Sequence, residues 1–163
     1  MTIIVRYPPE EINDCTSKTI FLAGSIEMGK AVDWQSALIG DITKQSVSKD
    51  VFILNPRRPD WKNWSDLSVD NPEFVEQVEW ELRGLRLANI IVMFFAENTI
   101  SPISLLEFGL NAESGKLVVY CEKGYSRKGN VDIVCRTYGI TQASSYTQLL
   151  EIVMDRLVND KFG

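Results

Sequence analysis

Stretches of consecutive apolar residues alternate with amphipathic segments along the chain. Apolar runs stand at residues 19–23, 51–54, 90–95 and 117–121, and a shorter one stands near 133–135. Such runs are typical of strands in a parallel sheet that helices cover on both faces. We therefore predict a strand at each of them.

The segments between these runs carry the start signals of helices. Asp33 can cap a helix that we expect to end at about Gln45. Asn71-Pro72 opens a second helix and Ser101-Pro102 a third, because a capping side chain and a proline in the first turn both favour a helix start. A last helix is expected from about Tyr146 to Val158.

This alternation predicts an α/β fold, a three-layer sandwich with a mainly parallel sheet of the flavodoxin or Rossmann type. The 163 residues suit a single domain over residues 1–163. Residues 1–17 contain Pro8-Pro9 and a polar stretch, so we expect an N-terminal arm outside the core. Residues 122–131 are basic and contain glycine, and we expect a loop there.

The helix that begins at Ser101 places one carboxylate inside a segment whose apolar side chains otherwise predict a buried helix. Its helical wheel predicts two apolar stripes, Ile103 with Leu106 and Leu110, and Leu105 with Phe108 and Ala112. Ser104, Glu107 and Asn111 form a narrow polar seam between the stripes. Such a seam suits a site that holds a carboxylate rigidly in a partly dry pocket. The alternative is a carboxylate at the rim of the core, satisfied by the backbone or by a lysine.

A second carboxylate, Glu81, lies at the edge of the apolar stripe of the preceding helix. Gly84 follows it by about one turn, and a residue without a side chain allows another group to approach closely. We therefore expect Glu81 to project beside the core.

Ligands of parallel sheets bind outside the carboxyl ends of the strands. The segments expected at that edge are residues 24–30, 55–58, 96–101 and 122–130. The first of them offers two glycines, a hydroxyl and a lysine, which could receive a phosphate or a ribose on backbone N–H groups. By itself this signal is weak, because any strand-to-helix turn can contain glycine.

The amino-acid composition excludes several kinds of catalytic and metal site. The chain has no histidine, which excludes imidazole bases, Ser-His-Asp triads and histidine-built zinc sites. Acid–base or nucleophilic work must come from carboxylates, hydroxyls, lysine or cysteine, and we expect no metal and no cofactor. The formal net charge of -5 argues against binding to a nucleic acid polymer.

The number and spacing of the cysteines indicate the cellular compartment in which the protein works. The three cysteines, Cys15, Cys121 and Cys135, are far apart and include no CxxC pair, which favours reduced thiols in a cytoplasmic protein. The sequence shows no cleavable signal and no apolar run of membrane-spanning length, so we expect no membrane association.

Four short blocks carry a resemblance to a known family. They are Phe21-Leu22-Ala23-Gly24-Ser25-Ile26, Asn55-Pro56-Arg57-Arg58, Gln77-Val78-Glu79-Trp80-Glu81 and Ser104-Leu105-Leu106-Glu107-Phe108-Gly109. With them, the chain from Ile20 to Ile133 resembles the nucleoside 2-deoxyribosyltransferase family and its relatives that hydrolyse nucleoside monophosphates.

The resemblance implies roles for the two carboxylates. Glu107, before Phe108-Gly109, matches the family's nucleophile, and Glu81 matches a second acid that is commonly Asp. Cleavage of an N-glycosidic bond passes through an oxocarbenium-like state, which one carboxylate can stabilise or trap while the other protonates or orients the leaving base. Glu107 and Glu81 are therefore the catalytic pair we expect, with Asp33 in reserve.

Besides Glu81, two further positions depart from the family pattern. Ser101 stands where the transferases carry an Asp that engages the base. Glu27 stands where the monophosphate hydrolases show an Arg, although Ser25, Gly29 and Lys30 fit their phosphate loop. The resemblance therefore leaves open whether the reaction is transfer or hydrolysis, and whether the substrate is a nucleoside or a nucleoside monophosphate.

Substrate contacts are expected mainly at the same edge of the sheet. The residues proposed for them are Gly24, Ser25, Ile26, Lys30, Asp33, Trp34, Asn55, Arg57, Ser101, Ser104 and Asn130. Trp34, Trp61, Trp64 and Trp80 are candidates for stacking on a base, a loop tryptophan first, although a single Trp is more often part of a core. Arg57 and Arg58 could hold a phosphate or form a solvated pair.

The resemblance also implies assembly as a homodimer or a higher homo-oligomer, with Asn130 reaching a neighbouring subunit's site. The leading hypothesis is an enzyme that hydrolyses or exchanges the N-glycosidic bond of a nucleoside or nucleoside monophosphate through a Glu nucleophile. The alternative is a non-catalytic nucleotide-binding sensor on the same fold. A flavodoxin-like redox or receiver domain fits less well, since the strand at 90–95 ends without an acidic cluster.

Overall fold

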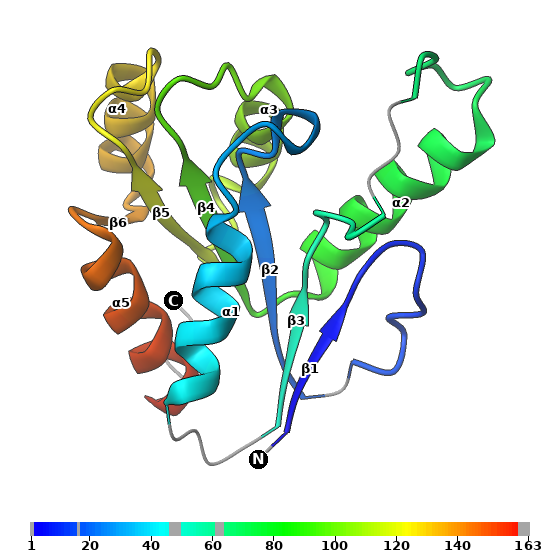
Figure 1. The fold of residues 1–163 in the computed structure, drawn as a ribbon. Helices are drawn as coiled ribbons and strands as arrows, with labels where there is room; N and C mark the ends of the chain where they lie inside the picture. Colours follow the sequence, from blue (N-terminus) through cyan, green and yellow to red (C-terminus); the bar gives the residue numbers. More distant parts are fainter. Residues whose placement is uncertain (1, 16, 46–49, 61–63, 160–163) are drawn as a thin grey trace.

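Parallel strands form one sheet at the centre of the molecule (Figure 1). The computed structural model describes residues 2–15, 17–45, 50–60 and 64–159. Within them the strand order is β1-β3-β2-β4-β5-β6, and every neighbouring pair is parallel. The strands are β1 (Ile3–Arg6), β2 (Lys18–Gly24), β3 (Val51–Leu54), β4 (Ile90–Phe95), β5 (Leu117–Cys121) and β6 (Thr141–Ala143).

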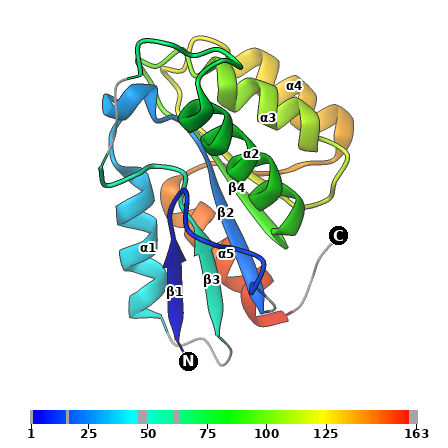
Figure 2. The same cartoon turned by 90° about the vertical axis from the view of Figure 1, so that its right-hand side faces the viewer.

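Helices cover both faces of the sheet (Figure 2). They are α1 (Trp34–Lys44), α2 (Pro72–Leu87), α3 (Pro102–Asn111), α4 (Lys128–Tyr138) and α5 (Tyr146–Asn159), with a short 3₁₀ turn at Glu27–Gly29. Buried residues of α2, α3 and α4 form one core cluster, and those of α1 and α5 form the other. Alternate residues of β4 enter the two clusters, as expected for a strand buried on both faces. The predicted three-layer α/β sandwich is confirmed.

The chain reverses its direction of travel across the sheet between β2 and β4. From β2 it first moves outward to β3, and then crosses back over β2 to β4 and continues to β5 and β6. Such a switch point opens a crevice between the carboxyl ends of the two adjacent strands, where ligands of open α/β sheets bind. The loops that follow β2 and β4 therefore frame the candidate site.

The expectation that residues 1–17 form an arm outside the core was wrong. Ile3–Arg6 pairs with β3 as an edge strand, with Ile3 opposite Val51. Ile12 is fully buried, and Glu10 O accepts a hydrogen bond from Trp80 Nε1 at 2.9 Å. The sequence could not show this, because the partner strand lies more than 40 residues away.

The prediction of a strand near residues 133–135 was also wrong, since this segment lies in α4. Val131 and Cys135, four residues apart, are buried on one side of the helix, whereas Ile133 is exposed. The last strand is instead β6, whose short Thr-Gln-Ala sequence gives little strand signal. The predicted loop at 122–131 accordingly ends earlier, at the start of α4. None of the described helices combines the length and apolarity that a membrane span requires.

Candidate active site

Glu107 lies on the buried side of α3. Its side chain is 8% exposed, and Ser104 and Phe108 are buried beside it. Phe108 packs edge-on against Phe95 of β4, with ring centroids 5.7 Å apart. The predicted polar seam is thus part of the face that meets the sheet. The stripe of Ile103, Leu106 and Leu110, which we expected to be buried, is exposed by 58%, 58% and 64%.

Glu81 is held on α2 by a neighbouring glutamine. Gln77 Nε2 donates to Glu81 Oε1 at 2.7 Å and to the carbonyl oxygen of Pro56 at 3.2 Å. One turn further along α2, a Cβ atom at Gly84 would come within 2.7 Å of the Phe21 ring. The glycine therefore seats α2 closely against β2, as the sequence indicated, and Gln77 fixes the carboxyl group above that contact.

The two carboxyl groups interact electrostatically. Burial raises the pKa of Glu81, although the hydrogen bond from Gln77 partly opposes the rise. Burial also raises the pKa of Glu107, and the charge of Glu81 raises it further. Two buried carboxylates that repel each other resist ionising together, and the pair tends to keep one proton near neutral pH. One group can then act as a nucleophile or charge stabiliser and the other as an acid.

Three buried hydroxyl groups join the ends of β2 and β4. Ser25 Oγ lies 2.6 Å from Ser101 Oγ and 3.0 Å from Thr99 Oγ1, and the latter two are 2.8 Å apart. Ser25 Oγ also accepts a hydrogen bond from the N–H of Ala96 at 3.0 Å. Ser101 is the residue before α3, but its side chain serves this network and makes no capping hydrogen bond. The network fixes the switch-point crevice and the start of the helix that carries Glu107.

Comparison with known protein families gives a match over most of the chain. A family model described as nucleoside 2-deoxyribosyltransferase like matches residues 17–125. The chain belongs to this family. Members of the nucleoside 2-deoxyribosyltransferase-like family are in general enzymes that act on small nucleoside substrates by glycosyl transfer or cleavage.

A solved structure shows the same fold. The crystal structure of a conserved protein from Enterococcus faecalis V583 superposes with a TM-score of 0.61 at 14% identity, over 86% of this chain and 99% of that one. No curated protein matches the chain.

Two of the four tryptophans considered for base stacking, Trp34 and Trp80, lie in the core. Trp34 is 3% exposed, stacks on Phe94 with centroids 5.1 Å apart, and donates to the carbonyl oxygen of Ser25 at 3.0 Å. Trp80 is fully buried. Both placements argue against contact with a base. Trp64 is partly exposed and packs edge-on against Phe74, and Trp61 lies outside the described residues.

Arg57 is engaged by the loop that follows β2. Its guanidinium donates to the carbonyl oxygens of Gly29, Ala31 and Val32 at 2.9 to 3.1 Å. Asn55 Oδ1 accepts the N–H of Arg57 at 3.0 Å, which shapes the turn before it. These contacts make Arg57 a clamp on the loop and argue against the phosphate contact expected for it.

The other expected substrate residues divide between the crevice and the surface. Gly24 ends β2 at a φ of 127°, and a Cβ there would overlap Phe94 O of β4, so glycine is required. Asp33 caps α1 by accepting the N–H of Ser36 at 3.1 Å. Ile26 is half-buried and Lys30 exposed in the same loop, while Asn130 is exposed in the first turn of α4.

Sequence reasoning did not assign site roles to Gln77 and Thr99. Gln77 stands four residues before Glu81, and that spacing places two side chains on one face of a helix. Thr99 carries no comparable signal, because only the fold brings it to Ser25.

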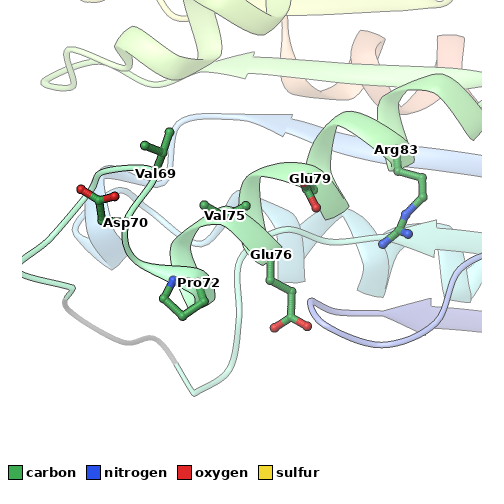
Figure 3. Close-up of a pocket in the computed structure, with 7 residues that line it drawn as sticks. All are labelled: Val69, Asp70, Pro72, Val75, Glu76, Glu79 and Arg83. Carbon is green, nitrogen blue, oxygen red and sulfur yellow. The ribbon is translucent and has the colours of Figure 1, made fainter.

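A separate pocket lies on the other side of α2 (Figure 3). Its lining is Val69, Asp70, Pro72, Val75, Glu76, Glu79 and Arg83. These helical positions face away from Gln77 and Glu81, so this pocket does not belong to the carboxylate pair.

Proposed function

We propose that this protein cleaves the N-glycosidic bond of a nucleoside, with Glu107 as the nucleophile and Glu81 as the proton donor. The observation that carries the proposal is the pair of acids on α2 and α3. Glu107 is buried, Gln77 holds the Glu81 carboxyl group, and burial raises the pKa of both acids. A surface carboxylate pair would not show this. The family of the chain supports the same class of reaction.

The proposed reaction has two steps. Ionised Glu107 attacks C1′, the C1′–N bond breaks with its electron pair passing to the base, and the protonated carboxyl of Glu81 supplies a proton to that base. Water then attacks C1′ of the glycosyl ester, gives its proton to Glu81, and releases the sugar and Glu107. Base exchange would replace this water by a second base.

We expect hydrolysis to exceed transfer. Transfer requires that a second base is bound while the glycosyl ester persists. An Asp at position 101 could accept charge-assisted hydrogen bonds from the edge of that base. The hydroxyl of Ser101 is instead shared with Ser25 and Thr99. Each lost bond costs about 1.5 kcal/mol, or roughly tenfold in acceptor occupancy. Quantitative exchange with negligible free sugar at low-millimolar acceptor base would contradict this.

The main experiment is base release from a panel of nucleosides and nucleotides, separated by chromatography. We expect free base from the wild type, and none above background from Glu107→Gln. The matched control is Glu113→Gln, because Glu113 is an exposed carboxylate just beyond the end of α3. If the wild type binds a nucleoside with no base release, the alternative of a non-catalytic sensor holds.

We also propose that two copies of the chain associate through α3. A row of apolar side chains is exposed along this helix, with exposed fractions of 58 to 72%. It consists of Ile103, Leu106 and Leu110 on α3 and of Ile100 just before it. An isolated apolar row on a helix is a common feature of interfaces, and a two-fold axis would pair it with itself. The expectation that Asn130 reaches the neighbouring site depends on this arrangement.

The location in the cytoplasm stays a prediction. The three cysteines are free thiols.

A further inference from the structure

The side-chain amide of Gln77 on α2 is hydrogen-bonded at one end only. Gln77 is 4% exposed. Its Nε2 donates one proton to the carbonyl oxygen of Pro56 at 3.2 Å and the other to Glu81 Oε1 at 2.7 Å. Its Oε1 is buried and has no hydrogen-bond partner among the described residues. Native structures seldom leave a buried acceptor unpaired, because this costs stability. The requirements of folding therefore do not by themselves favour a glutamine at this position.

The carbonyl oxygen of Pro56, just after β3, determines which end of the amide faces Glu81. If the amide were turned over, Gln77 Oε1 would face that carbonyl oxygen, and two acceptors would meet with no proton between them. The N–H end is therefore kept toward Glu81, which lies one turn further along the same face of α2.

The bond from Gln77 makes the two carboxyl oxygens of Glu81 different. Oε1 accepts the N–H, whereas Oε2 has no hydrogen-bond partner in the part of the chain that the structure describes. In a protonated carboxyl group the carbonyl oxygen is the better acceptor and the other oxygen carries the proton. The proton of Glu81 therefore belongs on Oε2.

The same bond favours the ionised form of Glu81. Hydrogen bonds to a charged acceptor are roughly twice as strong as those between neutral groups. Burial raises the pKa of Glu81, and the bond from Gln77 opposes the rise. The N–H of Gln77 therefore binds most strongly to the carboxylate that forms when Glu81 gives up its proton.

The charged groups around Glu81 do not replace this bond. Glu107 on α3 carries a like charge. The two arginines of the loop after β3 are engaged by backbone carbonyl oxygens and by Asp60. Glu79 and Arg83 line the pocket on the opposite side of α2 (Figure 3). Within the described residues, Gln77 is thus the only hydrogen-bond donor to the carboxyl group of Glu81.

We propose that Gln77 is a positioning residue for the acid: it directs the proton on Glu81 Oε2 to the leaving base and stabilises the carboxylate that remains. The proton passes from Oε2 to the base as the C1′–N bond breaks, and the attacking water returns a proton to Oε2 in the second step. This inference rests on the proposed function, which makes Glu81 the acid. Because the bond strengthens as the proton leaves, its effect belongs to kcat and not to KM.

Kinetics of Gln77→Met test this role, since methionine has a similar length and donates no hydrogen bond. With an ordinary deoxynucleoside we expect kcat to fall about tenfold and KM to stay within about twofold. With a 7-alkylated purine deoxynucleoside, whose base leaves without needing a proton, kcat should fall by less than about twofold. An equal loss with both substrates, or a loss in KM alone, would overturn the inference.

Gln142→Met is the matched control. Gln142 of β6 donates to Asp132 Oδ1 at 2.6 Å, so this substitution also removes a bond from an amide to a carboxylate, but at the edge of the sheet far from α2. Both substrates should react at the wild-type rate in this variant. Losses in Gln142→Met that match those in Gln77→Met would contradict a specific role of Gln77.

NMR spectroscopy tests the contact in the wild type, whether or not base is released. The Nε2 protons of Gln77 should shift between pH 5 and pH 8.5, because burial raises the pKa of both acids into this range. The shift should be largely lost in Glu81→Gln. The amide of Gln142 should not shift, because hydrogen bonds from Lys128 and Gln142 lower the pKa of Asp132 although burial opposes them.

The NMR result separates failure of this inference from failure of the proposed function. A Gln77 amide that does not respond to pH, or that responds equally in Glu81→Gln, would overturn the inference even in an active enzyme. A responding amide in a protein that releases no base would support the hold of Gln77 on Glu81 and contradict the proposed function alone.

Discussion

Replacing Glu107 by Gln tests the chemistry and the electrostatics of the site together. The amide has nearly the same shape as the carboxyl group but cannot ionise, so it cannot attack C1′. Loss of a nucleophile should lower kcat by at least ~10³-fold, equivalent to about 4 kcal/mol of activation free energy. A folded variant with a rate near that of the wild type would refute the assignment of Glu107.

The same substitution should stabilise the protein at alkaline pH. Burial and the charge of Glu81 raise the pKa of Glu107 in the folded state, so folding favours the protonated form. The wild type should therefore be most stable below the unfolded pKa and lose stability as the pH rises through the folded value. At pH 8 the variant should gain on the order of 1–3 kcal/mol in free energy of unfolding, because the buried charge and its repulsion of Glu81 are gone.

Urea unfolding of the wild type, Glu107→Gln and Glu113→Gln between pH 5 and pH 8.5 measures this effect. The wild type and the exposed control should lose stability together over the range, whereas Glu107→Gln should show a flatter profile. A variant that follows the wild-type pH dependence would mean that Glu107 is not desolvated in solution.

Three further predictions concern the surroundings of the pair. Glu81→Gln should lower kcat by roughly 10²-fold or more and remove the alkaline limb of the pH–rate profile, because the proton donor is lost. Gly84→Ala should destabilise the protein by about 1–3 kcal/mol in thermal unfolding, since its Cβ would press on the Phe21 ring. Leu106→Glu should yield a monomer by light scattering if the apolar row on α3 joins two copies, and an unchanged dimer would exclude that row.

The sequence predicts most of the fold where one element carries its own signal. β3, β4 and β5 coincide with the predicted apolar runs, and Asn71 caps α2 through its side chain as expected. The failures lie where the signal is in a distant partner. β1 looks like an arm until β3 is beside it, and the exposed side of α3 cannot be told from its buried side because both are apolar.

The candidate site was also predictable only where a residue carries its own signal in the sequence. Glu107 and Glu81 stand out in the sequence as carboxylates beside apolar stripes, and the family resemblance assigns them roles. That they interact is a property of the fold, since 26 positions and the whole of β4 separate them. Glu27 Oε1 accepts hydrogen bonds from the N–H groups of Ile100 and Ser101, just before α3, and this contact likewise appears only when the loops after β2 and β4 come together.

The topology explains why these two acids share one site. A right-handed crossover from β3 through α2 to β4 carries α2 over β2, and the next crossover begins with α3 on the same face. Gly84 rests α2 on Phe21 of β2, and Phe108 rests α3 on Phe95 of β4. The separation of Glu81 and Glu107 is therefore fixed by the packing of two helices on adjacent strands. Substitutions at this packing should change the coupled titration of the pair even where they leave both carboxylates in place.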